Sequence, residues 1–316
     1  MRHFAAAEID AVLDFPSLID ALAAAFRGGF HAPERHHHPI ERPGEATATT
    51  LLMPAWTRFG WGEDFLGAKI VNVFPGNGAR GLPAVQGLYV LQSGVTGAPI
   101  ATLDGTRLTV WRTAAASALA ARYLARADAR RLLIVGAGQL APFLARAHAS
   151  VRPIKRIAVW NHRPEGAHRL AAALGDEGFN AHVVRRLEDG VRDADIISCA
   201  TLSEAPLIAG GWLEAGQHLD LVGAFSMRMR EADDVALKRA RVFVDTEAAM
   251  SEGGDVALGL KAGAITRADV TGDLAALVRG APGRLAADEI TLFKSVGASI
   301  EDLAAAMLVW RKAGAG

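Results

Sequence analysis

The sequence contains a single cysteine, Cys199, so no intrachain disulfide can form, and we expect a reducing compartment. Cys199 lies in the apolar segment 195–201, which favours a small buried side chain over a nucleophile. The chain has no run of about 18 apolar residues, which a membrane-spanning helix would need. Its first residues also lack the pattern of a signal peptide. We therefore expect a cytoplasmic protein with no membrane partner.

Neither sign of charge is in excess. The 34 basic residues balance the 34 acidic residues, and no basic stripe is found, so we do not expect nucleic acid as a partner. A small anionic ligand stays compatible with this balance, because one or two arginines suffice to bind it. With 316 residues, of which 51% are hydrophobic, the chain is long enough for about two domains.

Clusters of metal-ligating residues are also missing. His36, His37 and His38 are consecutive, so their side chains point in different directions, and no cysteine or carboxylate cluster accompanies them. We predict a solvated loop over residues 31–46 and no metal site. A nucleophile elbow, a phosphate-binding P-loop and a zinc-binding helix motif are not found either.

The first third of the chain has the pattern of an α+β domain. Residues 1–30 show helical spacing of apolar residues after Pro16, and a long alanine-rich helix is predicted over 107–127. Between them, four strand-like runs are separated by glycine, proline and asparagine, and the last two form a predicted hairpin around 93–97. These runs are 47–54, 66–74, 84–92 and 98–104.

After residue 127 the pattern changes to short apolar runs that alternate with helical stretches. Such alternation predicts a parallel sheet covered by helices on both faces. The final segment, 286–310, is predicted to form one or two helices. The strand-like runs are 132–135, 157–160, 182–184, 195–200, 218–222 and 241–244.

The turn after the first of these strands has the sequence of a dinucleotide site, G-x-G-x-x-A over 136–141. Gly136 permits the tight turn, Gly138 lets the backbone approach a pyrophosphate, and Ala141 allows the next helix to pack closely. The helix N-terminus offers free N–H groups to the phosphates. We predict that this turn, with Ala137, Gln139 and Leu140, binds a dinucleotide.

The second strand of this region ends before Asn161, His162 and Arg163, where NAD-specific sites carry an acidic residue. Arg163 is able to pair with a 2′-phosphate instead, so we predict a preference for NADPH, with NADH possible. The alternative interpretation is that Arg163 is a solvated residue in front of a helix.

Motifs along nearly the whole chain resemble those of the ornithine cyclodeaminase/μ-crystallin family. They are LMPA at 52–55, AKIV at 68–71, LDG at 103–105, RTAA at 112–115, GAGQ at 136–139, DLVGA at 220–224, EGGD at 252–255 and FKSVG at 293–297. The resemblance implies an α/β protein in which a Rossmann-type doubly wound sheet, 116–289, is inserted in a discontinuous α+β domain. That second domain, 1–115 completed by 290–316, would bind substrate and form a homodimer, with the active site between the domains.

The resemblance also implies three residues of the reaction. Lys69 would reach the reacting centre, and Arg112, supported by Arg35, would bind the substrate carboxylate. Without the family, Lys69 would be interpreted as a lysine extending from a sheet edge, and Arg112 as a surface residue of a helix. Further positions implied to contact cofactor or substrate are Gln86, Arg112, Thr113, Thr201, Val222, Gly223, Ala224 and Ser295.

The implied reaction is hydride exchange at the α-carbon of an amino acid. Phe225 stands where the cyclodeaminase branch has an aspartate, so the distal ammonium of ornithine would lose its partner. The pattern therefore favours NADPH-dependent reduction of Δ1-pyrroline-2-carboxylate or Δ1-piperideine-2-carboxylate to L-proline or L-pipecolate, with Phe225 against the ring. The alternatives are an ornithine cyclodeaminase, an alanine-type amino-acid dehydrogenase, and a non-catalytic NADPH-dependent binding protein of the μ-crystallin type.

Overall fold

The computed structural model describes residues 1–60 and 62–314. The chain divides into two compact units, the first formed by Met1–Arg112 with Ala298–Gly316 and the second by Thr113–Gly297. The first boundary falls inside helix α3 (Gly105–Leu124), which runs through it without interruption.

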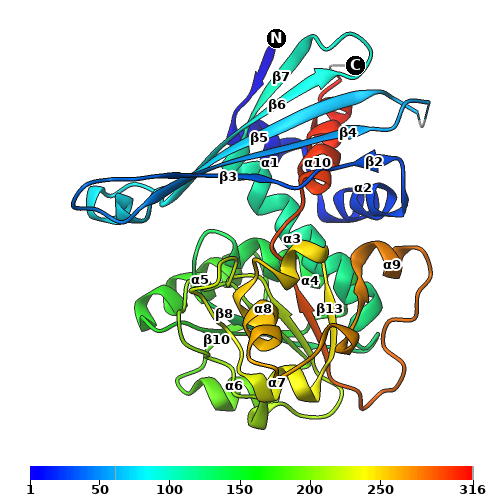
Figure 1. The fold of residues 1–316 in the computed structure, drawn as a ribbon. Coiled ribbons are helices and arrows are strands. Elements are labelled where there is room, and N and C mark those ends of the chain that lie inside the picture. Colours follow the sequence, from blue (N-terminus) through cyan, green and yellow to red (C-terminus); the bar gives the residue numbers. More distant parts are fainter. Residues whose placement is uncertain (61, 315–316) are drawn as a thin grey trace. The chain divides into compact units, whose positions relative to one another are not determined.

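The first unit is built on a mixed sheet with the strand order β1-β7-β6-β5-β4-β2, and β3 pairs with β4 (Figure 1). Helix α10 (Ser299–Lys312) packs against β4, β5, β6 and helix α2. The other elements are β1 (Arg2–Phe4), α1 (Ala6–Val12), α2 (Phe15–Arg27), β2 (Phe30–His31), β3 (His36–Ile40), β4 (Ala48–Thr57), β5 (Phe65–Val73), the 3-10 helix η1 (Pro75–Arg80), β6 (Val85–Ser93) and β7 (Pro99–Asp104).

Strand β5 shows how this sequence separates the two faces of the sheet. Phe65, Gly67, Lys69 and Val71 are buried, whereas Ile70 is exposed. Side chains alternate along a strand, so the odd-numbered residues face helix α10 and the even-numbered residues face the opposite side. Lys69 is therefore placed on the covered face.

The second unit is an entirely parallel sheet with the order β10-β9-β8-β11-β12-β15-β13-β14. Helices α4 (Ala141–Val151) and α5 (Pro164–Asp176) cover one face, and α6 (Leu187–Asp193) and α7 (Asp234–Arg239) cover the other (Figure 1). The predicted parallel sheet between two helical layers is confirmed. Its strands are β8 (Arg131–Val135), β9 (Arg156–Trp160), β10 (Ala181–Val183), β11 (Ile196–Cys199), β12 (His218–Leu221), β13 (Arg241–Val244), β14 (Val270–Asp273) and β15 (Thr291–Lys294).

Helices and short 3-10 turns connect these strands. They are α4 (Ala141–Val151), α5 (Pro164–Asp176), α6 (Leu187–Asp193), η2 (Gly210–Trp212), α7 (Asp234–Arg239), η3 (Glu247–Met250), α8 (Gly254–Lys261), η4 (Arg267–Asp269) and α9 (Leu274–Val278).

Two sequence-based expectations about this fold were wrong. Residues 36–40 were expected in a loop but form β3, because they pair with β4 while every side chain stays exposed and gives no apolar alternation. The segment 286–310 was expected to form one or two helices. Thr291–Lys294 instead form β15 between β12 and β13, and this short strand is buried on both faces, so it also lacks alternation.

Within residues 1–60 and 62–314, no helix combines the length and the apolar character that crossing a membrane would require.

Candidate active site

The glycine-rich turn after β8 has the geometry of a phosphate-binding turn. Gly136 has a φ of +106°, and a Cβ there would lie 2.6 Å from the carbonyl oxygen of Ala200, so only glycine fits. A Cβ on Gly138 would meet no atom within 4 Å, so this part of the backbone faces open space. The turn leads into helix α4, and the first N–H groups of a helix favour an anion.

A hollow of about 510 Å³ opens beside this turn. It brings together the predicted residues Ala137, Gly138, Asn161, His162 and Arg163. Glu165, Gly166 and Arg169 also line it and were missed by the sequence reasoning. The available signal was the spacing of four between Glu165 and Arg169, which places both on one side of helix α5.

Other predicted cofactor positions meet at the carboxyl ends of neighbouring strands in the same unit. Thr201 follows β11, the turn 222–224 follows β12, and Ser295 follows β15 and donates from its N–H to the carbonyl of Leu221 at 3.1 Å. A Cβ on Gly223 would lie 2.2 Å from the carbonyl oxygen of Thr201, so the two loops touch. This is the edge where ligands bind in open parallel sheets.

Lys69 and Arg112 come together in the first unit around two carboxylates of helix α10. Lys69 Nζ lies 2.7 Å from Asp302 Oδ2 and 2.8 Å from Oδ1. Arg112 donates from Nε to Asp302 Oδ1 at 3.0 Å and from Nη1 to Glu301 Oε2 at 2.8 Å. All four side chains are buried, and Thr109 Oγ1 lies 3.4 Å from Lys69 Nζ.

The environment of Lys69 changes the pKa of its side chain. Burial and the neighbouring Arg112 lower its pKa, Asp302 and Glu301 partly oppose this, and the resulting pKa is about 8. Arg112 stays protonated, since the two carboxylates raise its pKa against the effect of burial. The cluster thus holds two cations and two anions away from water.

Asp302 and Glu301 were not predicted as site residues. The only signal in the sequence was a pair of acidic residues in an otherwise alanine-rich helix, 301–307, and such a pair normally marks the first turn of a helix. Their burial follows from the packing of α10 on β5, which the sequence pattern did not indicate.

The other predicted residues of this unit lie apart from Lys69. Gln86 is exposed on β6 and, by strand alternation, lies on the opposite face of the sheet from Lys69. Arg35 directly precedes β3, where the register would set it opposite Met53, the partner of Lys69 on β4.

The remaining expectations concern single residues of the second unit and the histidines. Thr113 is half-buried on α3, and Phe225 is exposed by 37% after the 222–224 turn. His36, His37 and His38 lie on β3, and no group of three potential metal ligands occurs in the described part of the chain.

Solved structures with the same architecture support this description. The structure of Thermococcus litoralis Δ1-pyrroline-2-carboxylate reductase in complex with NADH and L-proline is 31% identical and superimposes with a TM-score of 0.94 over 100% of this chain and 98% of that one. An archaeal alanine dehydrogenase dimer with bound NAD is 30% identical, with a TM-score of 0.91 over 100% and 96% of the two chains. The fold and site define a Rossmann-type oxidoreductase.

Sequence comparison then gives the family. The chain belongs to the ornithine cyclodeaminase/mu-crystallin family, which it matches over residues 5–316. A Δ1-pyrroline-2-carboxylate reductase of Paracoccus denitrificans is 44% identical over 271 residues, which cover 85% of this chain and 84% of the relative. The resemblance seen in the sequence motifs is thereby confirmed.

Proposed function

We propose that this protein reduces a small cyclic imino acid with NADPH, forming L-proline from Δ1-pyrroline-2-carboxylate or L-pipecolate from Δ1-piperideine-2-carboxylate. The observation that carries this proposal is the buried cluster in which Asp302 holds Lys69 and Arg112 side by side. A bound nicotinamide dinucleotide would supply the hydride. The chain itself must bind the substrate carboxylate and keep the imine nitrogen protonated.

The charges of the cluster suit a zwitterion. A cyclic imino acid with a protonated nitrogen carries one negative and one positive charge, and the cluster of two cations and two anions is neutral as well. A guanidinium has five N–H donors. Among the described residues, Asp302 and Glu301 take one each from Arg112, so three stay available for a carboxylate. Lys69, with its pKa of about 8, is protonated at neutral pH and would pass its proton to the nitrogen of a neutral cyclic imine, which gives the protonated form that accepts hydride.

The second unit fits a dinucleotide. The turn 136–140 would hold the pyrophosphate, because Gly138 is open to solvent and helix α4 begins behind it. Asn161, His162 and Arg163 line the neighbouring hollow, and Arg163 would pair with a 2′-phosphate. Thr201, the turn 222–224 and Ser295 would contact the nicotinamide end, as would Arg112 and Thr113.

Two further roles follow the same reasoning. Arg35 would add a second positive charge for the substrate carboxylate, and Phe225 would lie against the methylene groups of the ring. An apolar phenylalanine gives no partner to the distal ammonium of ornithine, which supports a cyclic imine over a diamine as substrate.

We also propose a homodimer that buries the uncovered face of the first sheet. Leu52, Ile70 and Leu88 are cross-strand neighbours on β4, β5 and β6, and they are exposed by 37%, 36% and 41%. A row of apolar side chains on a sheet face is typical of a protein interface. A second copy of the chain would cover this face.

The test is NADPH oxidation by the purified protein with both cyclic imino acids, with pyruvate plus ammonia, and with ornithine. We expect turnover with the cyclic substrates and little with the others. Turnover of pyruvate and ammonia alone would identify an amino-acid dehydrogenase, and ammonia release from ornithine a cyclodeaminase. Tight binding of NADPH without turnover of any substrate would identify a binding protein and contradict the proposed reduction.

A further inference from the structure

Three motifs of this chain, 220–224, 252–255 and 293–297, meet in a buried cluster of charged side chains that the proposed reaction does not use. Glu231, Asp255 and Lys294 have no exposed surface. Asp255 Oδ1 accepts from the N–H groups of Glu231 at 2.7 Å and Ala232 at 2.9 Å, and Lys294 Nζ lies 3.1 Å from Asp255 Oδ2. Lys294 and Asp255 therefore hold the segment that carries Glu231.

The side chain of Glu231 is directed at the two loops that end β11 and β12. Its Oε1 accepts from the backbone N–H of Thr201 at 2.7 Å and from the Thr201 hydroxyl at 2.8 Å. Its Oε2 accepts from the backbone N–H of Gly223 at 2.7 Å, with Ala224 at 3.4 Å. One carboxylate thus joins both loops.

The hydrogen bonds of Glu231 fix the orientation of the peptide groups before Thr201 and Gly223 as well as the positions of the two loops. A trans peptide is planar, so the N–H of Thr201 and the carbonyl of Ala200 point in opposite directions. That carbonyl is the atom a Cβ on Gly136 would strike, so the peptide that Glu231 orients is packed against the dinucleotide turn. By the same planarity, the carbonyl of Val222 points away from Glu231, and within residues 1–60 and 62–314 it accepts no hydrogen bond. An amide group of a ligand would be able to donate to it.

We propose that Glu231 is a positioning residue, which sets the backbone of Thr201 and of the 222–224 turn for the dinucleotide, with Asp255 and Lys294 holding it in place. This inference rests on the dinucleotide binding proposed above. Glu231 does not touch the reacting atoms; it acts through the two loops.

The protonation of Glu231 gives the proposal a specific signature. Burial is the largest cause that raises its pKa, Lys294 opposes this, Asp255 adds to it, and the pKa reaches about 7. The neighbouring Cys199 stays neutral, since burial raises its pKa far above the usual value. A proton on either oxygen of Glu231 would face an N–H donor, so the loop bound to that oxygen would lose its acceptor. Dinucleotide affinity should therefore weaken as the pH falls through about 7.

The test uses Glu231→Gln in the full-length protein, with Asp195→Asn as the matched control. Asp195 is also a buried carboxylate of this unit, and its Oδ2 accepts from the N–H groups of Arg130 and Arg131 at 2.9 Å each. Asp195 directly precedes β11, whereas Thr201 follows the other end of this strand. Dissociation constants for NADH, which lacks the titrating 2′-phosphate, are measured by fluorescence between pH 5.5 and 8.5.

We expect Glu231→Gln to weaken NADH binding about tenfold at pH 8, the scale of one hydrogen bond to a charged group. It should also abolish the pH step. Asp195→Asn should lower the melting temperature but leave both the affinity and the pH step unchanged. Equal effects of the two variants on affinity, or a pH step that persists in Glu231→Gln, would overturn the inference. Failure of the wild-type protein to bind NADH or NADPH would overturn the proposed function instead.

A second variant covers the case in which Glu231→Gln does not fold. Asp255→Asn keeps an oxygen for the N–H of Glu231 but removes the negative charge that raises the pKa of Glu231. The midpoint of the pH step should then move to lower pH. An unchanged midpoint in a folded Asp255→Asn protein would contradict the role given to Glu231.

Discussion

Lys69 and Asp302, which are 233 positions apart in the sequence, form a fully buried ion pair with 2.7 Å between Nζ and Oδ2. The pair joins the middle of strand β5 to the first turn of the last helix. Arg112 binds the same carboxylate, so one aspartate determines where both proposed catalytic cations lie.

Replacing this carboxylate should therefore disable the enzyme. We expect Asp302→Asn to lower kcat for a cyclic imino acid about a hundredfold, because a misplaced lysine and arginine lose their orientation. We also expect it to lower the free energy of unfolding by about 3 kcal/mol, since a buried cation loses its partner. Steady-state kinetics and urea unfolding measure the two effects.

The control for Asp302→Asn is Asp14→Asn. This variant breaks an exposed ion pair between Asp14 and Lys312, which lies on helix α10 like Asp302. An exposed ion pair contributes about 1 kcal/mol or less to the free energy of unfolding, so the variant should keep the fold and the activity of the wild-type protein. Equal losses of kcat in both variants would show that the effect is general destabilisation of helix α10.

The pH dependence of the reaction should show the titration of Lys69. Its pKa of about 8 lies below the ordinary 10.5, and only the protonated amine donates to an imine nitrogen. The reductive kcat/KM should therefore fall as the pH rises through about 8, and it should be flat just below. Lys69→Met should lower kcat/KM severely and leave no such step. A rate that rises with pH through this range would identify Lys69 as a base instead.

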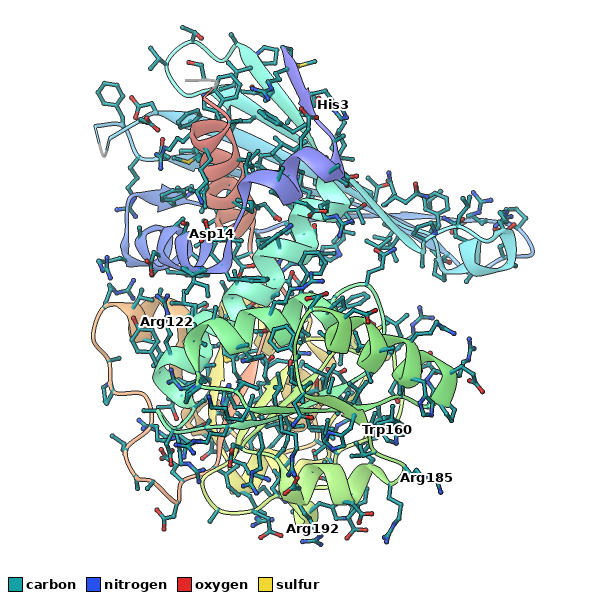
Figure 2. The ribbon with its side chains drawn as sticks, turned by 180° about the vertical axis from the view of Figure 1, so that it is seen from behind. His3, Asp14, Arg122, Trp160, Arg185 and Arg192 are labelled. Atoms are coloured by element: carbon teal, nitrogen blue, oxygen red, sulfur yellow. The ribbon has the colours of Figure 1, made fainter. Side chains whose placement is uncertain are left out.

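The cofactor preference should depend on Arg163. We expect Arg163→Ser to raise KM for NADPH about tenfold, the scale of a lost charge-assisted hydrogen bond, and to leave KM for NADH unchanged. The matched control is Arg185→Ser, another exposed arginine of this unit (Figure 2). Wild-type protein that prefers NADH would contradict the assignment of Arg163 before any variant is made.

The proposed dimer should depend on the row Leu52, Ile70 and Leu88. We expect Ile70→Glu to give a monomer in analytical ultracentrifugation, because the charge would be buried without a partner in the interface. Phe59→Glu is the control, since Phe59 lies in a turn with 90% of its surface exposed. If Ile70→Glu sediments like the wild-type protein, the association face lies elsewhere.

Acid should destabilise the second unit through His218. Burial lowers the pKa of this histidine from 6.5 to about 3, so between these values the unfolded chain binds a proton that the folded chain does not. The free energy of unfolding should thus decrease as the pH falls from 6.5 to 3, by up to about 1.4 kcal/mol per pH unit. His218→Gln should reduce this slope in thermal melts recorded across the range. An unaltered slope would show that other groups cause the acid loss.

Local pattern was sufficient for much of the second unit. Apolar runs of four to six residues between helical stretches predicted the strands β8, β9 and β11, and the glycine spacing at 136–141 predicted a dinucleotide turn after β8. Each of these signals comes from a few neighbouring residues, because the backbone geometry and burial of a short segment restrict which residue types it contains. The strands β3 and β15 show no alternation of apolar and polar residues, since β3 is exposed throughout and β15 is buried throughout.

The sequence alone predicted a dinucleotide site at the turn 136–141 and made Lys69 and Arg112 candidates for chemistry. Only the tertiary structure decided which groups surround them. Asp302 meets Lys69 because α10 returns to the sheet, and Glu231 meets Thr201 because β11 and β12 are neighbours. Such contacts join residues far apart in the chain, and their energies depend on burial that no local pattern records.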